Sequence, residues 1–342
     1  MSVTFGLDTF GDVTAGPDGH RHTQAHTLRD VIAEAVLAEQ VGVDCFGVGE
    51  HHRADFAISA PEVMLAAIAG RTERIILGSA VTVLSTDDPI RVFQRFSTLN
   101  AVSNGRAEVI LGRGSFTESY PLFGYDLANY DELFEDKLSL FATLLRAGPV
   151  TWSGPTHAPL SSQIIYPPLE TGALRTWVGV GGSPESVLRA ARYGLPLTLA
   201  IIGGNPLRFR PYVDLYHQSL ERFEKPMQPI AVHSPGHVAA TDDEAKNDLW
   251  PHYEIMINRI GAERGWPPAD RAHFEREAGP DGALYVGSPE TVAAKMTRTI
   301  RALGLARFDM KYSSGTLPHE KLMTSIELFG TKVMPRVRDL VG

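Results

Sequence analysis

The sequence predicts an α/β protein of the (β/α)8 TIM-barrel class, and three observations support this. Short apolar runs alternate with longer helical patterns from one end of the chain to the other. Eight strand–helix pairs can be counted, which is the number that closes such a barrel. The chain has 342 residues, about 90 more than the roughly 250 that the fold needs. We therefore expect one barrel domain over residues 1–342 with insertions; an open doubly wound sheet is the alternative.

Each predicted strand is a compact run rich in Val, Ile, Leu or Phe, as is typical of strands buried on both faces. In chain order the predicted strands cover residues 3–9, 44–49, 75–83, 107–111, 176–180, 198–202, 230–238 and 308–312. The predicted helices between them cover residues 27–41, 61–71, 90–102, 130–146, 184–193, 208–223, 242–264 and 319–341. Ser183-Pro184-Glu185 and Ser288-Pro289-Glu290 each place a capping serine, a proline and an acid where a helix begins.

The surplus length is expected in two insertions. One covers residues 148–175, is rich in proline and shows no clear helix. The other covers residues 265–303 and includes a spare helix at 288–303, before the last strand. The chain shows no repeat and no linker that would divide it into two domains.

Composition and charge narrow the class of protein. Hydrophobic residues make up 43% and charged residues 21%, the balance of an ordinary globular protein. The net charge of −8 argues against binding to nucleic acid or to an anionic membrane, which both favour basic surfaces. Cys45 is the single cysteine and is expected to be a buried structural thiol. Because neither a signal peptide nor a membrane-spanning run is found, we expect a cytoplasmic protein.

One candidate anion site follows the fifth predicted strand. Gly181-Gly182-Ser183 ends this strand and opens a helix, where backbone N–H groups, a hydroxyl and the helix dipole suit a phosphate. The same residues also suit a sharp turn with a helix cap, so both interpretations stay open. Arg113 ends the preceding strand and can reach the same anion with two hydrogen bonds. The dinucleotide-binding motif is incomplete and the Walker motif is missing. The sequence therefore predicts a site for one phosphate group and no site for NAD or ATP.

A Glu50-His51-His52 cluster follows the second predicted strand. Adjacent residues at a strand end point in opposite directions, so His51 and His52 are poorly placed to share a metal ion. The zinc motif His-Glu-x-x-His is also missing, and we expect no metal site. A histidine is well suited to move a proton near pH 7, with Glu50 orienting it or balancing its charge. Hydrogen bonding at the barrel rim is the alternative role for these residues.

Four segments of this chain resemble the bacterial luciferase-like flavin-dependent monooxygenases. In chain order they read GVDCFGVGEHH at 42–52, RTERIILGSAVTVL at 71–84, SNGRAEVILGRG at 103–114, and VGVGGSPESVLRAARYGLP at 178–196. They occur in the right order and at barrel-like spacing, and the match covers nearly the whole chain. The resemblance implies a (β/α)8 barrel that uses FMN.

The resemblance also assigns the residues of the cofactor site. Ala80-Val81 matches the family's non-proline cis peptide, which supports the flavin ring. Arg113 and Ser183 match phosphate-binding residues, and Ser186 aligns with another hydroxyl near that phosphate. Backbone contacts are expected from Gly181 and Gly182.

The resemblance assigns the catalytic residues as well. His51 aligns with the histidine proposed as acid or base in luciferase, and Glu50 with a pocket carboxylate. Two positions depart from luciferase, because Gly112 replaces a reactive cysteine and Asp88-Pro89 replaces His-Pro. We therefore expect a monooxygenase of unassigned substrate and not a light emitter.

The implied reaction uses reduced FMN, supplied by a separate flavin reductase. O2 converts it to a C4a-(hydro)peroxyflavin, which oxygenates a small organic substrate while a lid excludes water, and residues 148–175 are the candidate for this lid. Two alternatives remain: an F420-dependent oxidoreductase of the same fold, and a non-catalytic flavin-binding protein. The family also implies a homodimer, and the alanine-rich helix near residues 60–70 is a surface that could pack on a partner.

Overall fold

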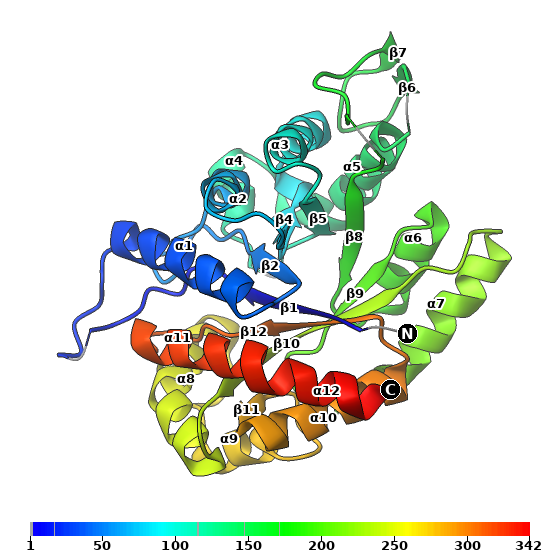
Figure 1. The fold of residues 1–342 in the computed structure, drawn as a ribbon. Helices are drawn as coiled ribbons and strands as arrows, with labels where there is room; N and C mark the ends of the chain where they lie inside the picture. The colour runs from blue at the N-terminus through cyan, green and yellow to red at the C-terminus, as the bar shows by residue number, and fades with distance from the viewer. Residues whose placement is uncertain (1–2, 17, 115, 147, 171) are drawn as a thin grey trace.

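The structure is a computed structural model that describes residues 3–16, 18–114, 116–146, 148–170 and 172–342. Within these ranges, eight parallel strands close into a barrel surrounded by helices (Figure 1). The barrel strands are β1 (Thr4–Thr9), β2 (Cys45–Val48), β3 (Ile76–Ser79), β5 (Ala107–Gly112), β8 (Arg175–Val180), β9 (Leu197–Ala200), β10 (Ile230–Val238) and β12 (Arg307–Lys311). Because β12 pairs with both β10 and β1, the sheet has no open end. The predicted barrel is confirmed, and the open doubly wound sheet is wrong.

The third predicted strand, residues 75–83, is divided in two. β3 ends at Ser79, and a short strand β4 (Thr82–Val83) pairs with β5 further along. The peptide bond between Ala80 and Val81 separates the two strands and is cis. The cis geometry expected from the family resemblance is therefore present at the expected position.

The outer helices follow the predicted order closely. They are α1 (Gln24–Gln40), α2 (Pro61–Ala69), α3 (Pro89–Val102), α5 (Tyr130–Leu144), α6 (Pro184–Tyr193), α7 (Arg210–Arg222), α8 (Asp242–Arg264), α10 (Pro289–Leu303), α11 (His319–Leu328) and α12 (Met334–Val341). A π-helical turn, η4 (Phe329–Val333), joins α11 to α12. Short 3-10 turns are η1 (Leu84–Thr86), η2 (Leu127–Asn129) and η3 (Pro206–Phe209). Ser183 and Ser288 cap α6 and α10 as predicted, each accepting a backbone hydrogen bond from the residue three positions later.

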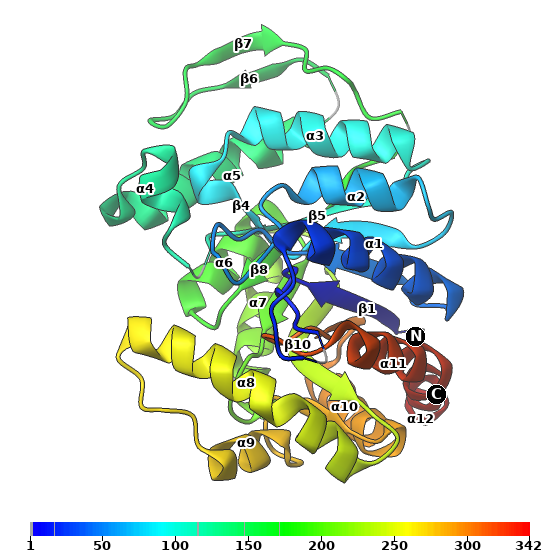
Figure 2. The same ribbon diagram turned by 90° about the vertical axis from the view of Figure 1, so that its left-hand side faces the viewer.

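The first insertion forms an antiparallel hairpin of β6 (Val150–Trp152) and β7 (Leu160–Gln163). The hairpin lies on the outside of the barrel, beside α3 and α5 (Figure 2). Gln94 and Ser97 of α3 donate hydrogen bonds to the carbonyls of Tyr166 and Pro167 that follow it. The hairpin therefore does not form the lid over the barrel mouth that the sequence suggested.

The second insertion adds secondary structure before the last barrel strand. It contains α9 (Arg271–Ala278), β11 (Tyr285–Gly287) and the predicted spare helix, α10. β11 extends the sheet beside the end of β10 without entering the barrel wall. The sequence analysis missed α9, and it also missed α4 (Ser119–Phe123) after β5.

A cluster of charged side chains lies inside the barrel. Arg307 of β12 forms ion pairs with Glu108 of β5 and with Asp309, and all three are buried. The indole N–H of Trp177 on β8 donates to the second oxygen of Glu108 at 2.9 Å. Because each buried charge has an oppositely charged partner, the cluster is compatible with burial. Cys45 lies close by as a buried free thiol, as predicted.

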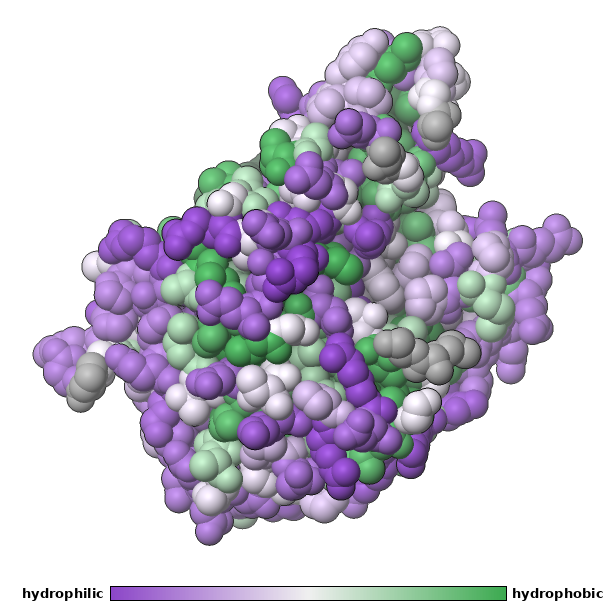
Figure 3. All heavy atoms as spheres, viewed as in Figure 1, coloured by the Kyte–Doolittle hydropathy of each residue, from purple (hydrophilic) through white to green (hydrophobic). Residues whose placement is uncertain are grey.

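The described helices contain none that is both long enough and apolar enough to cross a membrane. On the face shown in Figure 3, hydrophilic residues predominate, and apolar residues form separate patches between them.

Candidate active site

The structure brings three of the predicted phosphate-binding residues together at the N-terminus of α6. Arg113, which follows β5, donates from Nη2 to the Ser186 hydroxyl at 3.2 Å. The hydroxyls of Ser183 and Ser186 are 2.9 Å apart. Beside them Gly181 faces open space, since no described atom lies within 4 Å of where its side chain would begin. The cluster therefore offers cationic, hydroxyl and backbone donors at a helix N-terminus, a favourable place for an anion.

Two further charged residues complete this cluster. Asp131 on α5 accepts a hydrogen bond from Arg113 Nη1 at 2.7 Å, and its side chain is 73% exposed. Arg189 on α6 is only 9% exposed and donates from Nε to Glu135 at 2.6 Å. Its Nη1 is buried and finds no hydrogen-bond acceptor in the described part of the chain. A buried donor without an acceptor is costly, so Arg189 is well suited to an anionic ligand.

The sequence analysis missed Arg189, although a signal was present. Arg189 lies three residues after Ser186 and six after Ser183, so it follows them along one side of a predicted helix. Glu135 and Asp131 come from a different helix, and their contacts with Arg189 could not be inferred from spacing.

The cis peptide at Ala80-Val81 lies in the barrel wall among glycines. A side chain at Gly112 would begin 2.5 Å from a methyl group of Val81, closer than real contacts allow. A side chain at Gly49 would begin 2.7 Å from the carbonyl oxygen of Ala80. Gly112, where luciferase has a cysteine, is therefore required here by the packing of Val81.

His51 stands in an aromatic cluster at the barrel mouth. Its ring centroid is 4.5 Å from those of Phe10 and Phe56 and 4.9 Å from that of Phe116. Burial lowers the pKa of His51 to about 3, so the imidazole is neutral at pH 7. A neutral imidazole has one N–H donor and one nitrogen acceptor.

Glu50 does not orient His51, contrary to the expectation from the sequence. One carboxylate oxygen of Glu50 is 2.9 Å from Nε2 of His52, and the other accepts the backbone N–H of Val83 at 2.9 Å. The ring of His52 turns toward Phe123 of α4, away from the cluster around His51. Glu50 thus joins His52 to β4, just beyond the cis peptide.

A second histidine faces the same region from β10, and the sequence analysis gave it no role. Nδ1 of His233 is 2.8 Å from the Asp8 carboxylate, and its ring stacks on Phe10 at 6.1 Å between centroids. Phe10 therefore contacts both His51 and His233. Burial alone lowers the pKa of His233, but the charge and hydrogen bond of Asp8 raise it above its ordinary value. The pKa values of the two histidines at the mouth thus shift in opposite directions.

We expect His233→Asn to destabilise the protein by about 1.5–3 kcal/mol at pH 5.5, the scale of a hydrogen bond to a charged group, and by less at pH 9. The pKa of His233 is raised in the folded state. The pair with Asp8 therefore contributes fully below the unfolded-state pKa and is lost as pH rises through the folded-state pKa. Urea unfolding at both pH values measures the difference, with the exposed His273→Asn as control. An equal loss at both pH values would contradict a charged His233.

The fold and the clustered residues agree with a sequence comparison. The profile of the luciferase-like monooxygenase family matches residues 10–307. The chain belongs to this family.

Three relatives illustrate the range of this luciferase-like family. An uncharacterised protein, y4vJ of Sinorhizobium fredii, is 28% identical over 96% of this chain and 97% of its own length. The alkanal monooxygenase alpha chain of Photorhabdus luminescens is 21% identical over 96% of this chain and 97% of its own. The 4-hydroxyprotoasukamycin monooxygenase of Streptomyces nodosus subsp. asukaensis is 26% identical over 87% and 84%.

Solved structures share the fold of this luciferase-like chain. The monooxygenase RslO1 of Streptomyces bottropensis has a TM-score of 0.83 at 22% identity, covering 97% of this chain and 99% of its own. The oxygenating constituent of 3,6-diketocamphane monooxygenase from Pseudomonas putida, in complex with FMN, has a TM-score of 0.78 at 19% identity, covering 98% and 99%. An F420-dependent secondary alcohol dehydrogenase has a TM-score of 0.76 at 16% identity, covering 98% and 99%.

Proposed function

We propose that this luciferase-like protein is a monooxygenase that uses reduced FMN and O2 to oxygenate a small organic substrate. The observation that carries the proposal is the anion cluster of Arg113, Ser183 and Ser186. It follows β5 and β8, which pair with each other, and β5 also pairs with β3 and β4, between which the cis peptide Ala80-Val81 lies. A phosphate at the cluster and a flat ring against the cis peptide match the two ends of a flavin mononucleotide.

The residues of the cluster fit a phosphate dianion. Arg113 and the two serine hydroxyls donate toward one region, and the guanidinium of Arg189, which pairs with Glu135 and lies 3.7 Å from Asp131, adds positive charge nearby. Asp131 is the competing negative charge, but its exposed side chain can turn into solvent at little cost. These donors are charged or fixed by α6, so a phosphate would meet them with little rearrangement.

The mouth residues supply the surroundings for the reaction. Reduced FMN, when bound, provides the electrons that activate O2 for transfer of one oxygen atom to the substrate. Phe10, Phe56 and Phe116 line the mouth with apolar surface and exclude water. The neutral ring of His51 lies among them and is placed to donate or accept a hydrogen bond at the reacting oxygen. Glu50 fixes the N–H of Val83 and thereby the segment that follows the cis peptide.

The first experiment is an anaerobic titration of the protein with reduced FMN and, separately, with reduced F420. We expect tight binding of reduced FMN, followed on mixing with O2 by a transient absorbance distinct from that of oxidised FMN. Tight binding of F420 alone would favour an F420-dependent oxidoreductase, as in one structural neighbour. Tight binding of FMN without any oxygen chemistry would favour a non-catalytic flavin-binding protein.

The partners follow from the same proposal. Because no NAD(P)H motif is found in the sequence, a separate flavin reductase is proposed to supply reduced FMN. The cytoplasm fits this role, since it is a reducing compartment in which the free thiol of Cys45 persists.

A homodimer is proposed through α2. This helix exposes Val63, Ala66, Ala67 and Gly70, small apolar residues spaced along one face. Small residues let two helices approach closely, and a second copy of the chain is the proposed partner. Light scattering tests this: Ala67→Glu should lower the measured mass from dimer to monomer, and a monomeric wild type would contradict it.

A further inference from the structure

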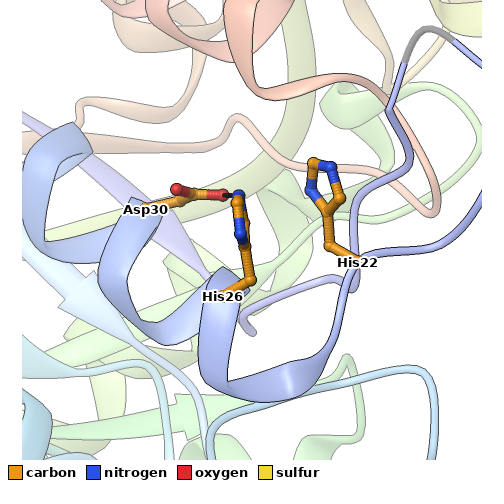
Figure 4. Close-up of side chains that lie close together, drawn as sticks. All are labelled: His22, His26 and Asp30. Atoms are coloured by element: carbon orange, nitrogen blue, oxygen red, sulfur yellow. Dashed lines mark ion pairs between the residues drawn. The ribbon is translucent and has the colours of Figure 1, made fainter.

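We propose that His22, His26 and Asp30 form a binding site for Zn²⁺ on the surface of the protein, apart from the candidate active site. Each residue offers one ligand atom, and the three atoms lie within 4.8 Å of one another. His22 lies just before Thr23, which caps α1, whereas His26 and Asp30 lie on α1 itself (Figure 4). The spacing of four residues places His26 and Asp30 on one face of the helix.

The distances suit a small tetrahedral ion. Zinc bonds of about 2.0–2.1 Å place neighbouring ligand atoms about 3.3 Å apart. Nε2 of His26 and Oδ2 of Asp30 are 3.3 Å apart. The rings of His22 and His26 have centroids 4.1 Å apart. Two of the ligands are therefore already at the required separation, and the ligand atom of His22, whose Nδ1 is 3.1 Å from the Thr14 hydroxyl, lies within 4.8 Å of both.

A second observation points to a cation. Oδ2 of Asp30 is buried and accepts no hydrogen bond from the described residues. Its side chain is 16% exposed, whereas that of His26 is 47% exposed. Its partner among the described residues is Nε2 of His26 at 3.3 Å, an ion pair only when that ring is protonated, and a metal ion held with the two imidazoles would give the buried oxygen a permanent cationic partner. The exposed side of His26 gives the ion access from solvent.

The ligand set selects a class of metal. Two imidazoles and one carboxylate favour zinc and its neighbours in the first transition series, whereas Mg²⁺ and Ca²⁺ prefer sites made wholly of oxygen. Three protein ligands leave the fourth position of a tetrahedral ion to water. No metal site was expected from the sequence, since the motif His-Glu-x-x-His is missing, but the spacing His-x3-His-x3-Asp is present at residues 22–30.

Metal binding would fix the segment between β1 and α1. The start of this segment is held at the barrel, where Asp12 pairs with Lys311 and accepts the backbone N–H of Gly315. Ala15 and Arg21 form an antiparallel bridge further along. His22 follows that bridge, so an ion shared with His26 and Asp30 would tie the far end of the segment to the helix. We therefore expect Zn²⁺ to protect this segment from proteolysis.

The test is isothermal titration calorimetry of untagged, metal-free protein with Zn²⁺. We expect one saturable site per chain, no comparable binding of Mg²⁺, and an affinity at least tenfold weaker in His26→Ala and in Asp30→Asn. His20→Ala is the matched control, since it removes an exposed histidine from the same segment but outside the cluster. Its affinity should equal that of the wild type. Co²⁺ should give the intense visible absorption of a tetrahedral site, and this band should disappear in the two ligand variants.

Three results would overturn the proposal. The first is no saturable binding of Zn²⁺ to the wild type. The second is unchanged binding in His26→Ala, which would place the ion elsewhere. The third is an equal loss in His20→Ala, which would indicate diffuse binding by surface histidines. The unfolding temperature of each variant without metal shows whether it is folded.

Discussion

Arg113→Ala is expected to weaken the binding of reduced FMN by about 10- to 150-fold, the equivalent of about 1.5–3 kcal/mol for hydrogen bonds to a charged group. The guanidinium of Arg113 lies beside Ser186 and over the ring of Tyr130, so it is held in one place at the N-terminus of α6. A fixed, charged donor contributes more to phosphate binding than a mobile one. Anaerobic fluorescence or absorbance titration measures the change.

Two variants on neighbouring residues sharpen this experiment. Arg192→Ala removes a positive charge from the same helix, but Arg192 is exposed and pairs with Glu135, so FMN affinity should change less than twofold. Asp131→Asn removes the carboxylate that pairs with Arg113 and should leave FMN affinity unchanged or tighten it. If Arg113→Ala has no more effect than Arg192→Ala, the phosphate binds elsewhere.

His51→Ala is expected to lower the yield of oxygenated product per reduced FMN consumed by about 100-fold, the scale of a hydrogen-bonding or proton-transferring group at the reacting atoms. The affinity for reduced FMN should stay near that of the wild type, because His51 contacts the aromatic cluster and not the anion cluster. Product and hydrogen peroxide are measured together, so that loss of coupling is separated from loss of turnover.

The pH dependence separates two roles for His51. Because burial lowers its pKa to about 3, the ring is neutral at both pH 6 and pH 8. The loss caused by His51→Ala should therefore be the same at these two pH values. A loss that is much larger at pH 6 would mean that the imidazolium form acts, against the environment seen here. His52→Ala is the comparison, since His52 pairs with Glu50 outside the cluster. Unchanged coupling in His51→Ala would exclude the proposed role of His51.

Most of the barrel could be predicted because its elements depend on local patterns. The helices at 184–193 and 242–264 were predicted to the residue, since caps and turns mark their ends. The hairpin of β6 and β7 was missed because its strands are short and exposed, and contacts with α3 and α5 hold it. The same holds for α4, a helix of one to two turns that local propensity alone does not support.

The candidate site likewise has residues that could be predicted from the sequence and contacts that could not. Arg113 and Ser183 were predicted because they follow strand ends, which meet at one edge of any parallel barrel, whereas Ser186 was predicted from the family resemblance. The structure confirms that they lie together; their role in binding FMN stays a prediction. The pairing of Glu50 with His52 instead of His51 was not predictable, because it depends on how the chain turns after β2.

The sequence by itself determined the eight barrel strands and their order, most of the outer helices, and the family to which the chain belongs. Those features depend on neighbouring residues and on motifs read along the chain. Only the tertiary structure decided which charges meet: Arg307 pairs with Glu108 from the opposite part of the chain, and Asp8 with His233. Closing the barrel turns alternate strand residues inward, and this brings together side chains that no local pattern connects.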